Sequence, residues 1–254
     1  NMKIETFGNK EHPKILLLHP MLTGPDFFEK CIMILKEQYY LIIPTLSGHY
    51  ENSTYISVKD EETQINSFLK KNKINKIQLM IGFSLGGNIA YYYFCKNHDK
   101  IERLLIDSAP LFYFPEFIKK HFFRQYKKCL INVRKDKEHA AEELNKCFNH
   151  MGEAQKNTAA LVTLDSLLNL TESCFHVDLY NLDEQTQKKI TFLYGTEDIA
   201  RLCLPRLKKY EHCQIIKLEK RNHCEYFQKE LDNYIREYII KNPEIPLSDS
   251  KSNL

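Results

Sequence analysis

The hydrophobic residues of the chain gather in short runs that are rich in isoleucine, leucine and tyrosine. Apolar runs of this length, with few polar residues inside them, are typical of strands that are buried on both faces of a sheet. They occupy residues 14–19, 39–43, 77–81, 104–106, 190–194 and 214–218. We therefore predict a strand at each of these positions.

The segments between most of these runs carry apolar residues three and four positions apart, which is the spacing of one helix face. The predicted helices cover residues 26–36, 58–71, 86–97 and, after the last run, 225–240. Strands that alternate with helices predict crossover units and a mostly parallel sheet with helices on both faces. The expected fold class is therefore α/β.

One long interval departs from this alternation, because no convincing strand lies between residues 106 and 190. Helical spacing recurs there over residues 115–130, 138–150, 153–170 and 172–182. We interpret residues 111–189 as an all-helical cap inserted into a core that comprises residues 2–110 and 190–241. The polar segment 242–254 is expected to form a flexible tail.

The composition is that of an ordinary globular protein, with 43% hydrophobic and 27% charged residues in a chain of 254. Lys and Arg number 36 against 33 Asp and Glu, an excess too small to suggest nucleic-acid binding. No apolar run approaches the roughly 18 residues of a membrane span. The eight cysteines have no close spacing and fit a reducing compartment. We therefore expect a cytoplasmic protein with no membrane span and no nucleic-acid partner.

Three of the eight glycines surround a serine, in the string G-F-S-L-G-G at residues 82–87. The string follows one predicted strand and opens the next predicted helix. A serine on such a sharp turn has strained backbone dihedrals, and glycines two positions to either side avoid collisions with it. The helix N-terminus also offers backbone N–H groups, here that of Leu85, to negative charge that develops beside Ser84. The spacing therefore predicts a nucleophilic serine.

With this motif in its strand–turn–helix context, the chain from about residue 4 to about residue 240, apart from the predicted cap, resembles the α/β-hydrolase superfamily, in particular its capped serine esterases. The resemblance implies a nucleophile at Ser84, an acid after a later strand and a histidine after the last strand. A Gly-x-x-Asp turn after the predicted strand 190–194 implies that Asp198 is the acid. The segment after the last predicted strand implies that His223 is the base.

Each of these assignments has alternatives in the sequence. Glu197 is adjacent to Asp198, and Asp107 ends the strand after the serine motif, where a minority of the superfamily keeps its acid. His19 and His49 also occupy recognisable positions of the superfamily, but neither position normally supplies the base. Asp198 remains the preferred acid.

The resemblance further implies two backbone donors for an oxyanion, the N–H groups of Leu85 and Met21. The loop that carries Met21 departs from the family pattern, which usually has His-Gly where this chain has His19 and Pro20. Proline has a fixed φ and no N–H. Met21 keeps its N–H, so the oxyanion hole can form, and Pro20 puts the conformation of the loop in question.

Aromatic residues are concentrated at the start of the predicted cap, where they would cover the mouth above Ser84. Phe112, Phe114 and Phe117 are the candidate substrate-binding residues, for an apolar acyl group. The alternative is that these rings form the core of the cap itself. Residues 119–137 contain eight Lys or Arg and one acid. Such a run is usually a solvated helix face, and the alternatives are attraction of an anionic substrate such as a CoA thioester, or of a membrane surface.

The sequence contains no H-E-x-x-H, C-x-x-C, G-x-G-x-x-G or Walker string, so no cofactor and no metal are expected. We therefore predict a carboxylesterase-like serine hydrolase that cleaves a small or medium acyl ester through an acyl-enzyme on Ser84. A thioesterase or an acyltransferase would use the same residues. A slow or non-catalytic ligand-sensing protein on the same scaffold is the alternative from a different class, and its protein partner is unknown.

Overall fold

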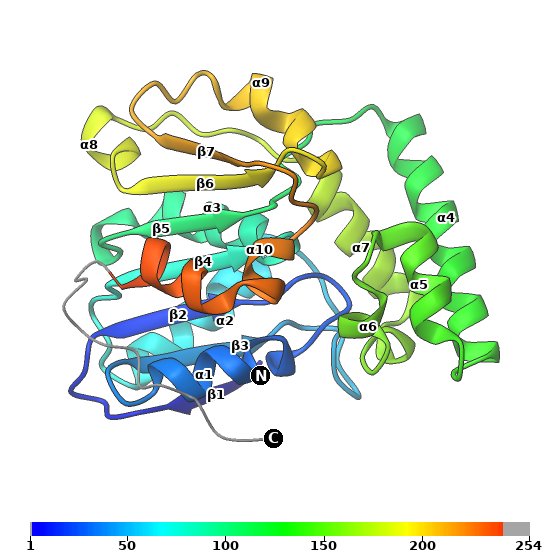
Figure 1. Ribbon diagram of the computed structural model, residues 1–254, viewed down its shortest axis with the longest axis horizontal. Helices are drawn as coiled ribbons and strands as arrows, with labels where there is room; N and C mark the ends of the chain where they lie inside the picture. The colour runs from blue at the N-terminus through cyan, green and yellow to red at the C-terminus, as the bar shows by residue number, and fades with distance from the viewer. Residues whose placement is uncertain (1, 241–254) are drawn as a thin grey trace.

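The structure, a computed structural model, describes residues 2–240 and is built around a seven-stranded sheet (Figure 1). The spatial order of the strands is β1-β3-β2-β4-β5-β6-β7. Strand β1 is antiparallel to β3, and the other neighbouring pairs are parallel. The predicted α/β class is therefore confirmed. The strands are β1 (Lys3–Phe7), β2 (Lys14–Leu18), β3 (Tyr40–Thr45), β4 (Leu79–Phe83), β5 (Leu104–Asp107), β6 (Ile190–Gly195) and β7 (Gln214–Leu218).

Strand β1 lies outside the predicted strands. It is an edge strand in which no residue is fully buried, and it pairs only with β3. Its sequence, K-I-E-T-F, alternates polar and apolar positions over a very short stretch and contains no continuous apolar run. A half-exposed strand of this kind carries a weaker signal than a strand that is buried on both faces.

Alternate residues of the buried strands face opposite layers of helices. In β2, Ile15 and Leu17 pack in the layer formed by α1 (Glu29–Leu35), α10 (Glu225–Lys229) and α11 (Leu231–Tyr234). Leu16 and Leu18 pack in the layer formed by α2 (Val58–Lys71) and α3 (Leu85–Asn97). Because successive side chains of a strand point to opposite faces, one continuous apolar run covers both sides of the sheet.

The order of the strands reverses around β2, whose two neighbours in the sheet are β3 and β4. In an open parallel sheet, a crevice forms at the carboxyl ends of the strands where the order reverses, and ligands bind there. The segment after β2 contains Pro20 and Met21, and the residue after β4 is Ser84. The topology therefore brings the predicted oxyanion loop and the predicted nucleophile to the same edge of the sheet.

Most of the segment between β5 and β6 lies beside this edge, and only its last helix, α8 (Glu184–Gln187), lies at the opposite edge (Figure 1). We call residues 111–189 the helical insertion. Two backbone hydrogen bonds, from Phe114 N to Phe175 O (2.8 Å) and from Val177 N to Phe112 O (2.7 Å), join the two ends of its α4–α7 segment, residues 112–177. Its buried side chains belong to the same hydrophobic cluster as α2 and α3. Its helices are α4 (Glu116–Lys135), α5 (Ala140–Phe148), α6 (Gly152–Gln155), the 3-10 helix Ala159–Leu161, α7 (Leu164–Phe175) and α8 (Glu184–Gln187).

Two of the helix predictions for the insertion are wrong. The segment 153–170 is divided, because α6 ends at Gln155 and α7 begins with its own cap, in which the Thr163 hydroxyl accepts a hydrogen bond from Ser166 N (3.1 Å). The segment 172–182 is not a helix, because α7 ends at Phe175. The residues that follow leave the helix to form the antiparallel hydrogen bonds with residues 112–114.

The predicted helix 225–240 is also divided. Glu230 separates α10 from α11 with non-helical dihedrals (φ −132°, ψ 48°), and its carboxylate pairs with Arg221. A π-helical turn, Ile235–Ile239, follows α11. The tail predicted over residues 242–254 lies outside the described residues.

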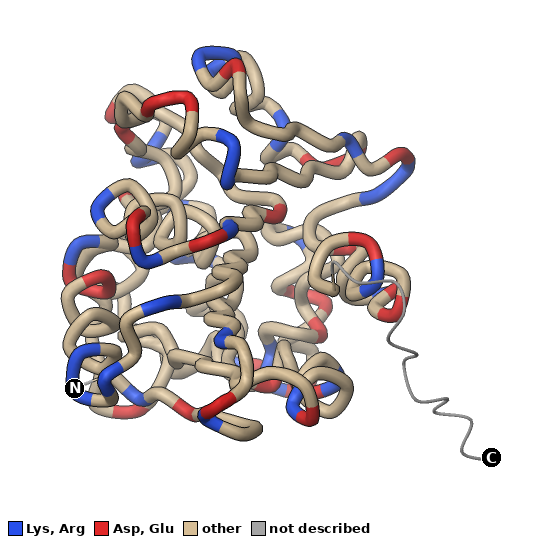
Figure 2. The backbone as a smooth tube through the Cα atoms, turned by 90° about the vertical axis from the view of Figure 1, so that its left-hand side faces the viewer, with Lys and Arg blue, Asp and Glu red and all other residues tan. Residues whose placement is uncertain are grey.

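Charged residues of both signs alternate along the end of the molecule opposite the insertion (Figure 2). Interspersed charges produce no strong field of one sign, the kind of field that steers a polyanion to a surface. Within residues 2–240, no helix has the length and apolar character needed to cross a bilayer.

Candidate active site

Ser84 occupies the sharp turn between β4 and α3. Its φ of 52° and ψ of −121° are strained for a non-glycine residue. Backbone hydrogen bonds hold this conformation, from Ser84 N to Asp107 O (2.8 Å) and from Gly87 N to Ser84 O (2.8 Å). A Cβ atom at Gly86 would lie 2.3 Å from the Leu18 carbonyl oxygen, so only glycine lets α3 approach β2 this closely. The serine thus lies on the strand–turn–helix element that its motif predicts.

Asp198 and His223 are brought together from two different loops. The buried Asp198 carboxylate accepts hydrogen bonds from His223 Nδ1 at 2.9 and 3.0 Å and from Ala200 N at 2.9 Å. Burial disfavours the imidazolium form of His223, but the adjacent Asp198 carboxylate outweighs this effect and raises the pKa of His223 well above 6.5. The two side chains therefore form a hydrogen-bonded pair in which a buried carboxylate fixes the orientation of the imidazole.

The alternative acids lie elsewhere. Glu197 is exposed. Asp107 is buried and accepts hydrogen bonds from the hydroxyls of Ser108 (2.7 Å) and Tyr234 (2.9 Å). Burial raises the pKa of Asp107 to about 6, although these hydrogen bonds act in the opposite direction. Ser108 Oγ in turn accepts a hydrogen bond from Cys224 N (2.9 Å), so Asp107 supports the loop that carries His223.

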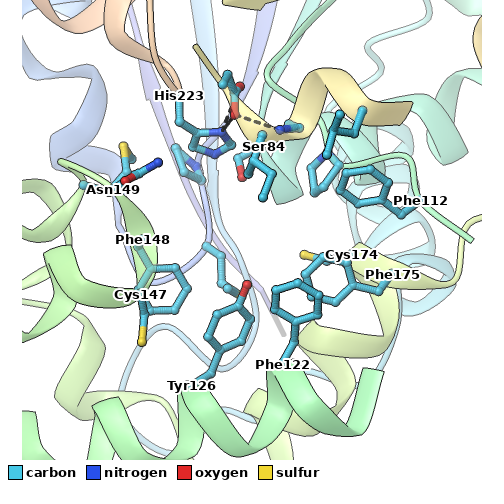
Figure 3. A pocket seen from close by; sticks show the side chains of 18 of the residues that line it. Ser84, Phe112, Phe122, Tyr126, Cys147, Phe148, Asn149, Cys174, Phe175 and His223 are labelled. Atoms are coloured by element: carbon cyan, nitrogen blue, oxygen red, sulfur yellow. Dashed lines mark hydrogen bonds and ion pairs between the residues drawn. The ribbon is translucent and has the colours of Figure 1, made fainter. Parts of the chain in front are cut away.

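Ser84 and His223 line the same cavity, which has a volume of about 270 Å³. Figure 3 shows both side chains at one end of the cavity, with Phe122, Tyr126 and Phe175 at the other end. In the described structure, the Ser84 hydroxyl makes no hydrogen bond to His223. The hydrogen bond between a nucleophile and its base is often long or poorly aligned before substrate binds. Residues 2–240 contain no group of three or more His, Cys, Asp or Glu side chains that could hold a metal ion.

The loop after β2 is fixed by two buried imidazoles. His19 Nδ1 donates to Pro20 O (2.9 Å), and its Nε2 accepts from Leu46 N (3.0 Å). His49 Nε2 accepts from Leu22 N (3.0 Å). Both rings are neutral, because burial lowers the pKa of His19 to about 3 and that of His49 to about 4. These histidines therefore shape the loop, and neither of them pairs with Asp198.

The question that Pro20 raises about the loop has a structural answer. The absent N–H of Pro20 leaves no donor unsatisfied, while its carbonyl oxygen accepts hydrogen bonds from His19 Nδ1 and from Thr23 Oγ1 (2.8 Å). The N–H groups of Met21 and Leu85 have no hydrogen-bond acceptor in the part of the chain that the structure describes. The structure therefore assigns neither N–H a partner that would compete with the predicted oxyanion.

Two of the three predicted substrate-binding residues line the cavity. Phe112 and Phe114 stack with ring centroids 4.6 Å apart and planes inclined by 16°. Phe117 does not reach the cavity and is 72% exposed. On α4 it lies five positions before the cavity residue Phe122, and the two side chains point about 140° apart around the helix. This prediction was wrong because the helix begins between Phe114 and Phe117.

Much of the remaining lining was not predicted from the sequence. It comes from separate elements of the insertion and from the turn after β6, and local patterns do not show which of their side chains converge. These lining residues are Cys147, Phe148, Asn149, Met151, Gln155, Cys174, Phe175, Ile199, Ala200 and Leu202.

Gly195, the last residue of β6, packs against the loop that carries His223. A Cβ atom at this position would lie 2.0 Å from Arg221 O and would push that loop away. We expect Gly195→Ala to lower the free energy of unfolding by about 2 kcal/mol or more, measured by urea denaturation. Gly24→Ala is the matched control, because the atom nearest to its Cβ would be a side-chain oxygen of Asp26, at 2.9 Å. We expect this variant to lose less than about 1 kcal/mol of unfolding free energy. Equal losses in the two variants would contradict the prediction.

The chain is similar to known proteins at low sequence identity. No family model matches the chain. The human "Serine hydrolase-like protein" is 24% identical over 119 residues, a match that covers 42% of this chain and 55% of that protein. The chain thus matches little more than half the length of this relative.

Solved structures match over nearly the whole chain. An alpha/beta hydrolase family protein from Desulfitobacterium hafniense superposes with a TM-score of 0.71 at 20% identity, covering 92% of this chain and 97% of that one. A thermophilic esterase from Thermogutta terrifontis superposes with a TM-score of 0.70 at 16% identity, covering 93% and 92%. These comparisons confirm at the level of the fold the resemblance found in the sequence, and the chain has the α/β-hydrolase fold.

Proposed function

We propose that the protein is a serine hydrolase that cleaves an uncharged carboxylic ester with an apolar acyl group. The observation that carries this proposal is the convergence of a strained Ser84 and the His223–Asp198 pair in one largely apolar cavity. Strained backbone at a nucleophile, a base within the same cavity and a buried acid behind the base are the parts that acyl transfer requires.

In the proposed mechanism, Ser84 Oγ attacks the ester carbonyl carbon while His223 Nε2 accepts the hydroxyl proton. Asp198 holds Nδ1 of the ring in its protonated form and stabilises the imidazolium. The N–H groups of Leu85 and Met21 donate to the oxyanion of the tetrahedral intermediate. The imidazolium then protonates the leaving alcohol, and water repeats the cycle on the acyl-enzyme.

The lining of the cavity supports an uncharged acyl group. Apart from Asp198 and His223, its residues are apolar or neutral, and no Lys or Arg is among them. The basic run of α4 does not contribute, and its buried Lys119 is already paired with Glu116 (3.1 Å) and Glu172 (2.7 Å). The cavity volume corresponds to roughly nine groups the size of a water molecule, which suits a medium-length chain. The esterase among the structural neighbours is in keeping with this substrate class.

The test is the intact mass of the protein after treatment with a fluorophosphonate. We expect one phosphonyl adduct on the wild-type chain and none on Ser84→Ala, because the reagent reacts only with an activated serine beside a working oxyanion hole. An adduct that persists in Ser84→Ala would place the reactive group elsewhere. A folded wild-type protein that forms no adduct would contradict the proposal and favour a ligand-sensing protein on the same scaffold.

A further inference from the structure

The peptide group between Met21 and Leu22 is held at both ends. Its carbonyl oxygen, Met21 O, accepts a hydrogen bond from Gln155 Nε2 (3.0 Å). Its N–H, on Leu22, donates to His49 Nε2 (3.0 Å). The two contacts come from opposite sides, since His49 belongs to the core and Gln155 belongs to α6 of the helical insertion.

The preceding peptide group, between Pro20 and Met21, is held through its carbonyl oxygen by His19 and Thr23. In a trans peptide the N–H points away from the C=O. The Met21 N–H therefore points away from these partners and stays free. With the peptide planes on both sides of Met21 fixed, the direction of this N–H is fixed as well.

The loop needs this support because Leu22 has a φ of 65°. A bulky residue in this left-handed region is strained and persists there only when its surroundings impose the conformation. Without the two contacts on the Met21–Leu22 peptide, the loop would be free to relax, and the Met21 N–H would turn with it.

The hydrogen bonding of Gln155 indicates a role other than stability. The side chain lines the cavity and is only 2% exposed. Its Nε2 must face Met21 O, because a carbonyl oxygen can only accept, and its Oε1 then has no hydrogen-bond partner within residues 2–240. A buried acceptor without a partner is unfavourable for folding. An apolar side chain of the same size would remove this unpaired Oε1 but would leave Met21 O without its donor, so the two effects on stability oppose each other.

We propose that Gln155 is a positioning residue for the oxyanion hole, which it completes from the helical insertion by fixing the peptide group that follows Met21. This inference rests on the proposed function. It implies that the insertion does more than cover the acyl chain, since one of its side chains sets the direction of a donor that stabilises the transition state. The expected signature is a lower kcat with an unchanged KM, because the oxyanion is present only after attack.

The test compares Gln155→Met with the wild type, using p-nitrophenyl butyrate as substrate and butylboronic acid as an inhibitor that forms a tetrahedral adduct on the serine. We expect kcat to fall about tenfold or more, with KM unchanged within about twofold and the boronate inhibition constant raised in parallel with the loss in kcat. We also expect the urea midpoint of the variant to stay close to that of the wild type, since the loss of the hydrogen bond to Met21 O and the removal of the unpaired Oε1 oppose each other.

Gln187→Met is the matched control. Gln187 is also a buried glutamine that donates its amide to a backbone carbonyl, Leu182 O at 2.8 Å, but it lies in α8, away from the cavity. We expect this variant to lose stability and to keep its kcat, which is the reverse of the effect expected at residue 155. If Gln155→Met keeps its kcat within about twofold, or changes only KM, the inference is overturned.

A second pair of variants tests the other end of the same peptide. His49→Gln retains an acceptor near the position of Nε2, whereas His49→Asn is too short to reach Leu22 N. We expect glutamine to retain most of the wild-type kcat and asparagine to lose it, with KM unchanged in both. Equal activity of the two variants would contradict a role for the peptide clamp. A wild-type protein that neither hydrolyses the ester nor reacts with a fluorophosphonate would refute the proposed function itself, and the inference with it.

Discussion

Ser84→Ala is expected to abolish ester hydrolysis. We expect kcat to fall about 10⁶-fold, because the other two residues of the triad cannot act without the nucleophile. The substitution removes the attacking atom and leaves the backbone of the turn in place. We therefore expect the urea midpoint to change little. The measurement is the steady-state rate with p-nitrophenyl butyrate, together with an unfolding curve of the same preparation.

Ser57→Ala is a suitable control for Ser84→Ala. The Ser57 hydroxyl caps α2 by accepting a hydrogen bond from Asp60 N (3.1 Å). Ser57 is not among the residues that line the cavity. Its loss is expected to lower stability by about 1 kcal/mol and to leave kcat unchanged. Residual activity of Ser84→Ala above a few per cent of the wild type would show that another group performs the reaction.

Asp198→Asn is expected to give the second largest loss, of about 10³- to 10⁴-fold in kcat, because an amide no longer holds the imidazole in the tautomer that the reaction needs. The pH dependence should change as well. In the wild type we expect kcat/KM to rise with pH as His223 loses its proton, and the Asp198 carboxylate raises the pKa of His223. Without the carboxylate the imidazolium is less stable, so the rise is expected at lower pH.

Asp107→Asn distinguishes the two candidate acids. Its side chain contacts Ser108 and Tyr234 and makes no hydrogen bond to His223 in the described structure. We therefore expect a loss in kcat of less than about tenfold, with the pH at which kcat/KM rises close to that of the wild type. A larger loss in this variant than in Asp198→Asn would assign the acid to Asp107.

The sequence predicts best those parts of the fold whose signal is local. Strands β2 to β6 are confirmed because each contains an apolar run that is too short for a helix. Strand β7 is confirmed as a strand, but none of its residues is buried, contrary to the buried strand expected there, because it lies at the edge of the sheet. The edge strand β1 carries no such run, since three of its five residues are exposed. The predicted helices of the insertion are misplaced where tertiary contacts override the periodicity of the sequence. Val177 is an example, because its N–H donates to Phe112 O and the residue is not helical.

The same distinction applies to the site. Ser84 is visible in the sequence because its turn needs glycines at fixed positions, and Asp198 and His223 follow from the order of the strands. The structure brings these three residues to one cavity. Gln155 has no comparable signal, because 134 positions separate it from Met21 and no pattern relates the two segments. Residues that meet only through tertiary packing are therefore the ones that sequence reasoning missed.

The attachment of the helical insertion has a consequence for changes of specificity. Two backbone hydrogen bonds, at Phe112 and Phe114, join the two ends of the α4–α7 segment, and neither depends on the identity of a side chain. Side chains make further contacts with the core: Ser166 Oγ accepts a hydrogen bond from Tyr55 N (3.0 Å), and Asn88 Nδ2 donates one to Ser173 O (2.9 Å). The segment can therefore be exchanged, by recombination in evolution or by grafting in the laboratory, without redesign of its closure, provided that the new segment restores these contacts. If Gln155 acts as we propose, a grafted module must also supply a donor to Met21 O. Substrate preference and turnover rate would then be inherited together.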